Sequence, residues 1–600
     1  MLDTLSPNEN IGESIPADTP HAVSVSLPTW KSNVGYEEGQ KWVVERMKTG
    51  YPRFFIHRSI DRFATTIVAK YGRQDDKAML FPTRATAQRC VDFLASREAS
   101  HAHALRVLEF VPCPTKSPPD SPYVLPRIYA VLYPKELWPL AKSFWQHTGE
   151  GVSSRRAEFC EKALAEGTMV EKSTIEEAPR LKKGPRRYQR QVSISGIQES
   201  EPHTNGHSTN GHTNTEELDP ARFVEERFGR NLNVGFAEQA KLATRRRIAG
   251  VLSKDMDLHD ALQQPEEIER VRHTDGFSVD DVLLYPCGMN SIFQMHRILR
   301  VARGEMKSVM FGFPYVDTLK ILEKWGSGVQ FYGHASTEDL DDLESRLEGG
   351  ERFLCLVTEF PGNPLLKSPD LKRIRRLADK YDFAVMIDET IGNICNINVL
   401  PDADIIVSSL TKIFSGDCNV MGGAAILNPS GRYYKQIQSV LAEEFEDNLF
   451  AEDSIFLERN SRDFVSRIAR INTNAELISD MLSAHPRIKQ VNYPKTSPTR
   501  QYYDDYKLPD GGYGGLLSCT FHSIDDAIAF YDTLDTAKGP SLGTNFTLAS
   551  PFVLLAHYGE LEWAAQYGCE ANLVRFSVGL EDEADLKHIF EKALDAIPAA

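Results

Sequence analysis

The chain has 600 residues, of which 41% are hydrophobic and 25% are charged, a balance typical of globular proteins. A net charge of −16 disfavours nonspecific binding to nucleic acid. No apolar run approaches the ~20 residues of a membrane helix. We therefore expect neither a nucleic-acid partner nor a membrane partner.

The nine cysteines are scattered and include no Cys-x-x-Cys pair, so neither a zinc ribbon nor a disulfide scaffold is expected. The first residues lack a basic region followed by an apolar core, which argues against a secretory signal. A reducing compartment fits this cysteine usage, and we expect a cytoplasmic protein.

Residues 1–170 carry aromatic and apolar side chains throughout, so this N-terminal extension is expected to fold. A strand-like piece at 22–27 and a helix-like piece at 37–47 favour an α/β module. No catalytic constellation is recognisable in the extension, and its function is left open.

Residues 171–220 hold few apolar side chains and are predicted to form a disordered linker. A basic run at 180–187 is compatible with nuclear import, with contact to an anionic surface, or with a plain solvated linker. The near-repeat at 204–213 contains two Asn-Gly-His steps. Two histidines without a third ligand are too few for a metal site, and no metal is expected.

The remaining block alternates between strands and helices, which predicts an α/β fold with a mostly parallel sheet and helices on both faces. In such sheets, ligands gather at the carboxyl ends of the strands. The predicted strands are 309–312, 329–332, 353–358, 384–388 and 403–407, and the clearest helices are 292–301, 317–325 and 371–380.

Lys412 follows the last of these strands, with hydroxyls at Ser409 and Thr411. A lysine amine in this position can form a Schiff base with pyridoxal phosphate, while the hydroxyls bind the phosphate. A surface lysine after a strand would look the same.

Asp388 ends another strand, where a carboxylate needs a cationic partner such as a pyridinium nitrogen, or serves as a helix N-cap. Gly288 and Met289 open a helical run, and free N–H groups at a helix start bind phosphate. Tyr315 could stack on an aromatic ring or pack in the core. Arg575 lies in a strand pattern and suits either a substrate carboxylate or a structural ion pair.

Taken together and in this order, these residues resemble one family, the pyridoxal-phosphate enzymes of cysteine and methionine trans-sulfuration. The resemblance covers about 222–600 and includes the motifs 360–366, 541–543 and 575–582. The long extension and linker are most similar to those of the fungal cystathionine γ-synthases.

The resemblance implies a type I pyridoxal-phosphate transferase fold, with a cofactor-binding large domain at 221–460 and a small α+β domain at 461–600. It also implies a role for each matching residue. Lys412 would hold the cofactor and move protons, and Asp388 would pair with the pyridine nitrogen. The implied phosphate ligands are Gly288, Met289, Ser409 and Thr411, with Tyr315 on the ring, Asn363 at the 3-oxygen, and Arg575 and Ser541 at the substrate.

Arg230 resembles an arginine that reaches the phosphate in a neighbouring subunit, which implies a homodimer or homotetramer. Three positions depart from the family pattern. Phe228 stands where a tyrosine is usual, Val-Asp follows Tyr315 instead of Gly-Gly, and Phe546 lies where an acidic residue is frequent.

The implied reaction is γ-replacement, in which L-cysteine displaces the acyl group of an O-acyl-L-homoserine to give cystathionine. O-acetylhomoserine sulfhydrylase and cystathionine lyase activities share the same motifs and remain alternatives. A non-catalytic protein on this fold would have little reason to keep Lys412, Asp388 and Arg575 together.

Overall fold

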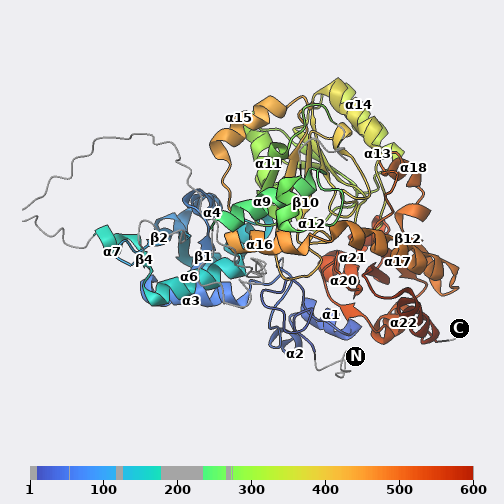
Figure 1. Ribbon diagram of the computed structural model, residues 1–600, viewed down its shortest axis with the longest axis horizontal. Helices are drawn as coiled ribbons and strands as arrows, with labels where there is room; N and C mark the ends of the chain where they lie inside the picture. The colour runs from blue at the N-terminus through green and yellow to red at the C-terminus, as the bar shows by residue number, and fades with distance from the viewer. Residues whose placement is uncertain are drawn as a thin grey trace, which may run out of the picture.

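The computed structural model describes residues 10–52, 54–116, 126–176, 234–264, 272 and 274–598. Figure 1 shows three parts: a blue and cyan domain on one side, a green and yellow block, and an orange and red part that carries the C-terminus. A short blue segment with helices α1 (Trp30–Glu37) and α2 (Lys41–Val44) lies apart from the first domain, against the C-terminal part.

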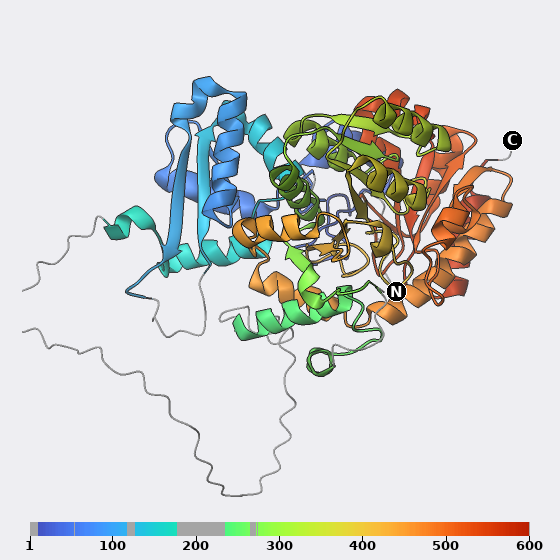
Figure 2. The same ribbon diagram turned by 90° about the horizontal axis from the view of Figure 1, so that it is seen from above.

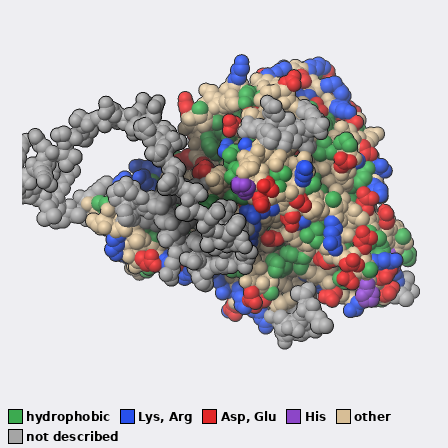
Figure 3. Space-filling view, viewed as in Figure 1, with side chains coloured by type: hydrophobic (Ala, Val, Ile, Leu, Met, Phe, Trp, Pro, Cys, Tyr) green, Lys and Arg blue, Asp and Glu red, His purple; other side chains and the backbone are tan. Residues whose placement is uncertain are grey.

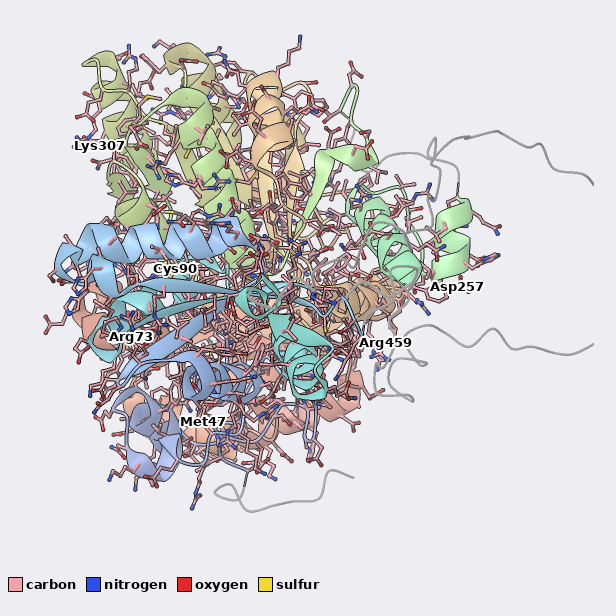
Figure 4. The ribbon with its side chains drawn as sticks, turned by 90° about the vertical axis from the view of Figure 1, so that its left-hand side faces the viewer. Met47, Arg73, Cys90, Asp257, Lys307 and Arg459 are labelled. Atoms are coloured by element: carbon pink, nitrogen blue, oxygen red, sulfur yellow. The ribbon has the colours of Figure 1, made fainter. Side chains whose placement is uncertain are left out.

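The N-terminal domain is a four-stranded antiparallel sheet in the order β1-β3-β2-β4, with helices on both faces. Central strand β3 is apolar on both faces: Ala130 and Leu132 pack towards α3 and α6, and Val131 packs towards α4 and α5. Figure 4 looks onto this domain, with Cys90 of α4 in it and Met47 below it. The bounds are α3 Arg58–Tyr71, β1 Asp76–Phe81, α4 Arg84–Arg97, β2 Arg106–Pro112, β3 Ile128–Pro134, α5 Trp138–Thr148, α6 Ser154–Glu166 and β4 Met169–Glu171.

A seven-stranded sheet in the order β5-β11-β10-β9-β8-β6-β7 forms the centre of the second part. Among the described strands of this sheet, β11 alone runs in the direction opposite to the others, so the predicted mostly parallel sheet is confirmed. The strands are β5 Val282–Tyr285, β6 Ser308–Phe311, β7 Val329–Tyr332, β8 Cys355–Glu359, β9 Ala384–Asp388, β10 Ile405–Ser409 and β11 Gly423–Leu427.

Helices cover both faces of this sheet, as its continuous apolar strands require. In β9, Val385 and Ile387 belong to one buried cluster, and Ala384 and Met386 belong to the other. The helices are α9 Val234–Ile248, α10 Leu258–Gln263, α11 Gly288–Arg303, α12 Val316–Trp325, α13 Thr337–Glu348, α14 Leu371–Tyr381, α15 Tyr434–Glu444 and α16 Ala451–Asn460.

The C-terminal part is a five-stranded sheet in the order β12-β13-β16-β15-β14, packed against helices. Its strands are β12 Ile488–Asn492, β13 Leu516–Phe521, β14 Ala537–Lys538, β15 Leu548–Ser550 and β16 Leu573–Ser577. Its helices are α17 Phe464–Ala484, α18 Arg500–Asp504, α19 Ile524–Thr533, α20 Phe552–His557, α21 Leu561–Gln566 and α22 Glu583–Asp595. This α+β arrangement beside a large α/β sheet is the type I fold that the resemblance implies.

The first 57 residues differ from the sequence prediction. The piece at 22–27 is extended and joins none of the three sheets. It pairs antiparallel with 12–15 through a single bridge, Ser14 with Val25, and it hydrogen-bonds to the catalytic part through Val23 N to Cys418 O (2.8 Å) and Leu27 N to Lys538 O (2.9 Å). The piece at 37–47 is no single helix, because Gly39 takes a left-handed φ of 66° between α1 and α2.

The ordered chain also continues past residue 170, since β4 ends at Glu171 and α7 spans Lys172–Glu176. The rest of the predicted linker and Arg230 lie outside the described residues. None of the described helices combines the length and apolarity required to span a bilayer.

Candidate active site

A cavity of ≈ 190 Å³ lies where the carboxyl ends of β8, β9 and β10 meet the start of α11. Its walls come from all three parts of the chain, and from above, in Figure 2, the N-terminal domain stands directly beside the catalytic block. On the face seen in Figure 3, basic and acidic side chains are interspersed over the catalytic block, so no field of a single sign dominates that face.

Lys412 lies in the turn after β10 with its side chain buried. Its Nζ is 2.9 Å from Tyr51 Oη and 3.3 Å from Ser541 Oγ. These contacts hold the amine inside the cavity, which rules out the alternative of a surface lysine.

The start of α11 forms a cradle against the end of β10. A Cβ at Gly288 would lie 2.7 Å from Ser409 Cβ, so only glycine permits this approach. Cys287, which precedes the helix, gives it no side-chain cap, and N–H groups at such a helix start bind anions. Thr411 Oγ1 accepts from Gly422 N at 3.1 Å and so ties the turn to β11.

Asp388 ends β9 and faces the cavity. Its Oδ1 accepts from Thr390 N at 2.9 Å within a turn. Among the described residues no helix begins directly after Asp388, so the alternative role as a helix N-cap is wrong. Desolvation raises the pKa of Asp388 to about 6, against the opposing hydrogen bond from Thr390. A cation brought next to this carboxylate would compensate the desolvation, which is the pairing a pyridinium nitrogen offers.

Glu359, at the end of β8, is buried and positions two site residues at once. The backbone N–H of Tyr315 donates to its Oε1, and the N–H of Asn363 donates to its Oε2 at 3.0 Å. Burial and then the nearby Asp388 raise the pKa of Glu359 to about 8. The sequence analysis did not assign Glu359 a role in the site.

Arg575 lies on β16 and is almost fully buried. Its Nη1 donates to Asn363 Oδ1 at 3.2 Å, and its Nη2 donates to Ser541 O at 2.8 Å. Burial lowers its pKa to about 10. Its hydrogen-bond acceptors are neutral oxygens; among the described residues no acidic side chain pairs with it, which leaves its charge available for a carboxylate.

The N-terminal region forms the opposite wall of the cavity, which the sequence analysis did not foresee. Its lining residues lie in the segment before α3, in the first turn of α3, and between the end of α5 and the start of α6. They are His21, Ala22, Val23, Gly50, Tyr51, Pro52, Phe54, Phe55, His57, Ile60, Trp145, Gln146, Gly149, Gly151, Val152 and Ser154. No periodicity or motif marks them as site residues, because a coil brings Tyr51 to Lys412 across 361 sequence positions.

The N-terminal domain docks on the elements that carry the cradle. Asn290 Nδ2, in the first turn of α11, donates to Thr148 O at 3.0 Å. Asp317 Oδ1 accepts from Gln146 Nε2 at 3.3 Å and lies 3.5 Å from His147 Nε2. The Val-Asp departure after Tyr315 therefore has a structural reason, since Asp317 is a docking residue for the extension.

The structure thus brings all the predicted site residues except Arg230 to one cavity or its immediate support. Gly288, Met289, Tyr315, Asn363, Asp388, Ser409, Thr411, Lys412 and Arg575 line it, and Ser541 contacts Lys412. The geometry fits pyridoxal phosphate: a glycine-limited cradle at a helix start, a desolvated carboxylate and an enclosed amine.

Comparison with known proteins agrees with this geometry. Residues 274–595 match the family model for Cys/Met metabolism PLP-dependent enzymes, and residues 59–153 match the model for the fungal trans-sulfuration enzyme N-terminal domain. The chain is 53% identical to cystathionine gamma-synthase of Neurospora crassa, over 98% of both chains. It is 39% identical to a cystathionine gamma-synthase-like enzyme of Amanita muscaria (98% and 97% covered) and 37% identical to cystathionine gamma-synthase of Saccharomyces cerevisiae (98% and 99% covered).

Proposed function

The chain belongs to the Cys/Met metabolism PLP-dependent enzyme family, and we propose that it acts as a cystathionine γ-synthase. The observation that carries the proposal is the convergence of Lys412, Asp388 and Arg575 at one cavity, in a chain that matches a cystathionine γ-synthase along nearly its full length. Its substrates would be an O-acyl-L-homoserine and L-cysteine.

Pyridoxal phosphate is the cofactor of this family, and when bound it withdraws electrons from the substrate carbons next to the amine. Lys412 would hold it covalently through Nζ. The phosphate would lie against the N–H groups of Gly288 and Met289 and the hydroxyls of Ser409 and Thr411. Arg230 would add a positive charge.

Asp388 would keep the pyridine nitrogen protonated, because a cation beside it restores the ionised carboxylate. Tyr315 would cover one face of the ring and assist departure of the leaving group, and Asn363 would hold the 3-oxygen. Glu359 fixes the backbone of both of these residues, so it serves as a positioning residue.

Arg575 would bind the substrate carboxylate through its guanidinium, with Ser541 beside it. A bidentate arginine–carboxylate pair is strong in a buried site, and it orients the substrate Cα towards Lys412. Lys412 Nζ would then take the proton from Cα and return protons after the replacement.

The overall change is substitution at Cγ. The bond between Cγ and the acyloxy oxygen breaks and releases a carboxylate. The sulfur of L-cysteine forms the new bond to Cγ, and the thiol gives up its proton. The product is L-cystathionine.

The test is a substrate panel on the purified, cofactor-loaded protein. O-acetyl- and O-succinyl-L-homoserine are each supplied with L-cysteine, and cystathionine is measured by mass spectrometry. We expect cystathionine from at least one acyl donor; release of the acyl group without cystathionine would refute γ-synthase activity.

A second candidate within the family is sulfhydrylation of O-acetylhomoserine or cleavage of cystathionine. The observation behind it is the altered surroundings of Tyr315 and the presence of Phe546, both within the part that selects substrates in the resemblance. Sulfide in place of cysteine, and cystathionine alone, separate these activities in the same assay.

We further propose a homodimer or homotetramer, in which Arg230 reaches a neighbouring subunit's phosphate. The large domain is placed at 221–460 and the small domain at 461–600. A cytoplasmic location is proposed on the nine cysteines, all of which are free thiols.

A further inference from the structure

The N-terminal region places one hydroxyl on the reactive amine. Tyr51 Oη lies 2.9 Å from Lys412 Nζ, and the same Nζ lies 4.3 Å from the centre of the Tyr51 ring. Among the described residues, the other polar partner of this amine is Ser541 Oγ, at the longer distance of 3.3 Å. Tyr51 is therefore the nearest hydrogen-bond partner that the described residues offer Lys412.

Neighbouring residues fix the position of Tyr51. The backbone oxygen of Tyr51 accepts from Phe54 N at 2.9 Å and from Phe55 N at 3.1 Å, which closes a tight turn. The Tyr51 ring also contacts the Phe54 ring, with centroids 5.8 Å apart.

The segment before this turn is fixed to the catalytic part of the chain. Trp30 N donates to Asp532 Oδ1 at 2.7 Å, and Leu27 O accepts from Tyr531 Oη at 3.1 Å. Together with the Val23 and Leu27 backbone bonds, these contacts hold the extended segment that leads to α1 and α2 and on to the Tyr51 turn.

A phenol hydroxyl suits an amine that gains and loses protons. It accepts a hydrogen bond from an ammonium and donates one to a neutral amine, so contact is kept in both states. Both side chains can bind and release a proton, and their hydrogen bond gives that proton a direct path between Oη and Nζ. A serine hydroxyl has no comparable acidity.

A cation near Tyr51 supports this chemistry. Burial lowers the pKa of Arg575 to about 10, and the charges that Tyr51 and Tyr315 can carry oppose that shift. Arg575 and Tyr51 line the same cavity, so the positive charge of Arg575 favours negative charge on the phenol oxygen. The other ionisable side chains that line the cavity are His21, His57, Cys287, Glu359 and Asp388.

We propose that Tyr51 is a catalytic residue contributed by the N-terminal region, which exchanges a proton with Lys412 Nζ. One proton moves between Oη and Nζ, and no other bond changes. The proposal rests on the proposed function. It means that the N-terminal extension supplies a catalytic residue and does not only line the cavity.

The test compares Tyr51→Phe with Tyr531→Phe. Each change removes one hydroxyl, and Tyr531 holds the same N-terminal segment but lies away from Lys412. We expect Tyr51→Phe to lower kcat for cystathionine formation at least about 10-fold with KM changed less than about threefold, as for loss of a proton-transfer group. Tyr531→Phe should keep kcat within about twofold.

A second readout needs no turnover. The visible absorption band of the cofactor-loaded protein is titrated with pH in the absence of substrate, and we expect Tyr51→Phe to shift its midpoint by at least about 0.5 pH unit while Tyr531→Phe leaves it in place. An unshifted midpoint with unchanged kcat overturns the proposal. Equal losses in the two variants overturn it as well, because they would show that the hydroxyl only holds the segment. If the wild-type protein forms no cystathionine, the proposed function fails, and the titration still decides the role of Tyr51.

Discussion

The two halves of the cavity wall are built in opposite ways. In the catalytic block, Glu359, Asp388 and Ser409 each end a parallel strand, so the sheet itself sets their positions. In the N-terminal region, Tyr51 and His57 lie in a coil and at a helix cap, and their positions depend on docking against the block. In the first wall, called the strand-end wall below, the positions of the reactive groups follow from the fold. In the second, called the docked wall, they follow from an interface within one chain.

The sharpest test of the strand-end wall is Lys412→Ala. Without the amine, cofactor attachment and proton transfer are both lost, so we expect cystathionine formation to fall by at least about 10³-fold. The visible cofactor band should disappear with it. Lys307→Ala is the matched control. This exposed lysine (Figure 4) directly precedes β6, at the end of the strand that points away from the cavity. Substantial activity in Lys412→Ala would contradict the mechanism.

Two adjacent carboxylates of this wall, Asp388 and Glu389, are expected to differ in role: the first affects catalysis and the second affects stability. Asp388→Asn should reduce kcat by about 10² to 10³-fold, since a neutral amide no longer stabilises a positive pyridine nitrogen. The melting temperature should change little. Steady-state kinetics and calorimetry on the same preparation measure both effects.

Glu389→Gln is the control for Asp388→Asn. Glu389 is buried and paired with Arg272, whose Nη1 donates to Oε2 at 3.2 Å. Removing this charge leaves Arg272 without its partner and should cost about 3 kcal/mol of unfolding free energy, while folded protein keeps its kcat. If Glu389→Gln lowered kcat as much as Asp388→Asn, the assignment of Asp388 would be wrong.

The docked wall can be broken at a buried ion pair. Arg155 of α6 lies 3.1 Å from Asp453 of α16, with both side chains buried and the guanidinium 3.9 Å above the Phe456 ring. Arg155→Ala leaves Asp453 unpaired and should destabilise the protein by about 3–5 kcal/mol. Calorimetry would show a lower melting temperature, and a separate early transition if the N-terminal domain detaches first.

Arg62→Ala is the matched control for Arg155→Ala. The pair Arg62–Glu161 lies within the N-terminal domain, and Arg62 is 57% exposed. Such exposed pairs contribute about 0–1 kcal/mol, so we expect a small shift in melting temperature. Equal effects of the two changes would mean that the interface ion pair has no special role in joining the walls.

The last test is the pH dependence that Glu359 gives to the stability of the protein. Its pKa rises from 4.5 in the unfolded chain to about 8 when folded, so the folded state binds the proton more tightly. The resulting stability is fully present below pH 4.5 and is lost as the pH rises through 8. Glu359→Gln should remove this dependence. Between pH 5 and 9, the free energy of unfolding from denaturation curves should therefore change less with pH in the variant than in the wild type. An equal change with pH in both proteins would contradict the assignment.

The sequence predicted the strand-end wall well because strand ends are visible as apolar runs followed by polar residues. Asp388 and Lys412 were found this way, and the order of motifs along the chain identified the family. The same logic placed Arg575 in a strand, which β16 confirms.

The docked wall could not be predicted in this way. The run at 22–27 has strand composition, yet it belongs to no sheet: its backbone bonds partly to residues 12–15 and partly to the catalytic part of the chain. Tyr51 has no local signal at all, since its partner is 361 positions away. Asp317 was noted only as a departure from the family pattern, and the structure shows that its neighbour is α5.

The cavity spans from Lys412 to His57, and this continuity has a consequence for inhibitor design. A compound that binds only the strand-end wall meets groups dictated by cofactor chemistry. A compound extended towards His21, Phe55 and His57 would also contact the N-terminal wall. Its selectivity would then depend on side chains that the reaction itself does not require.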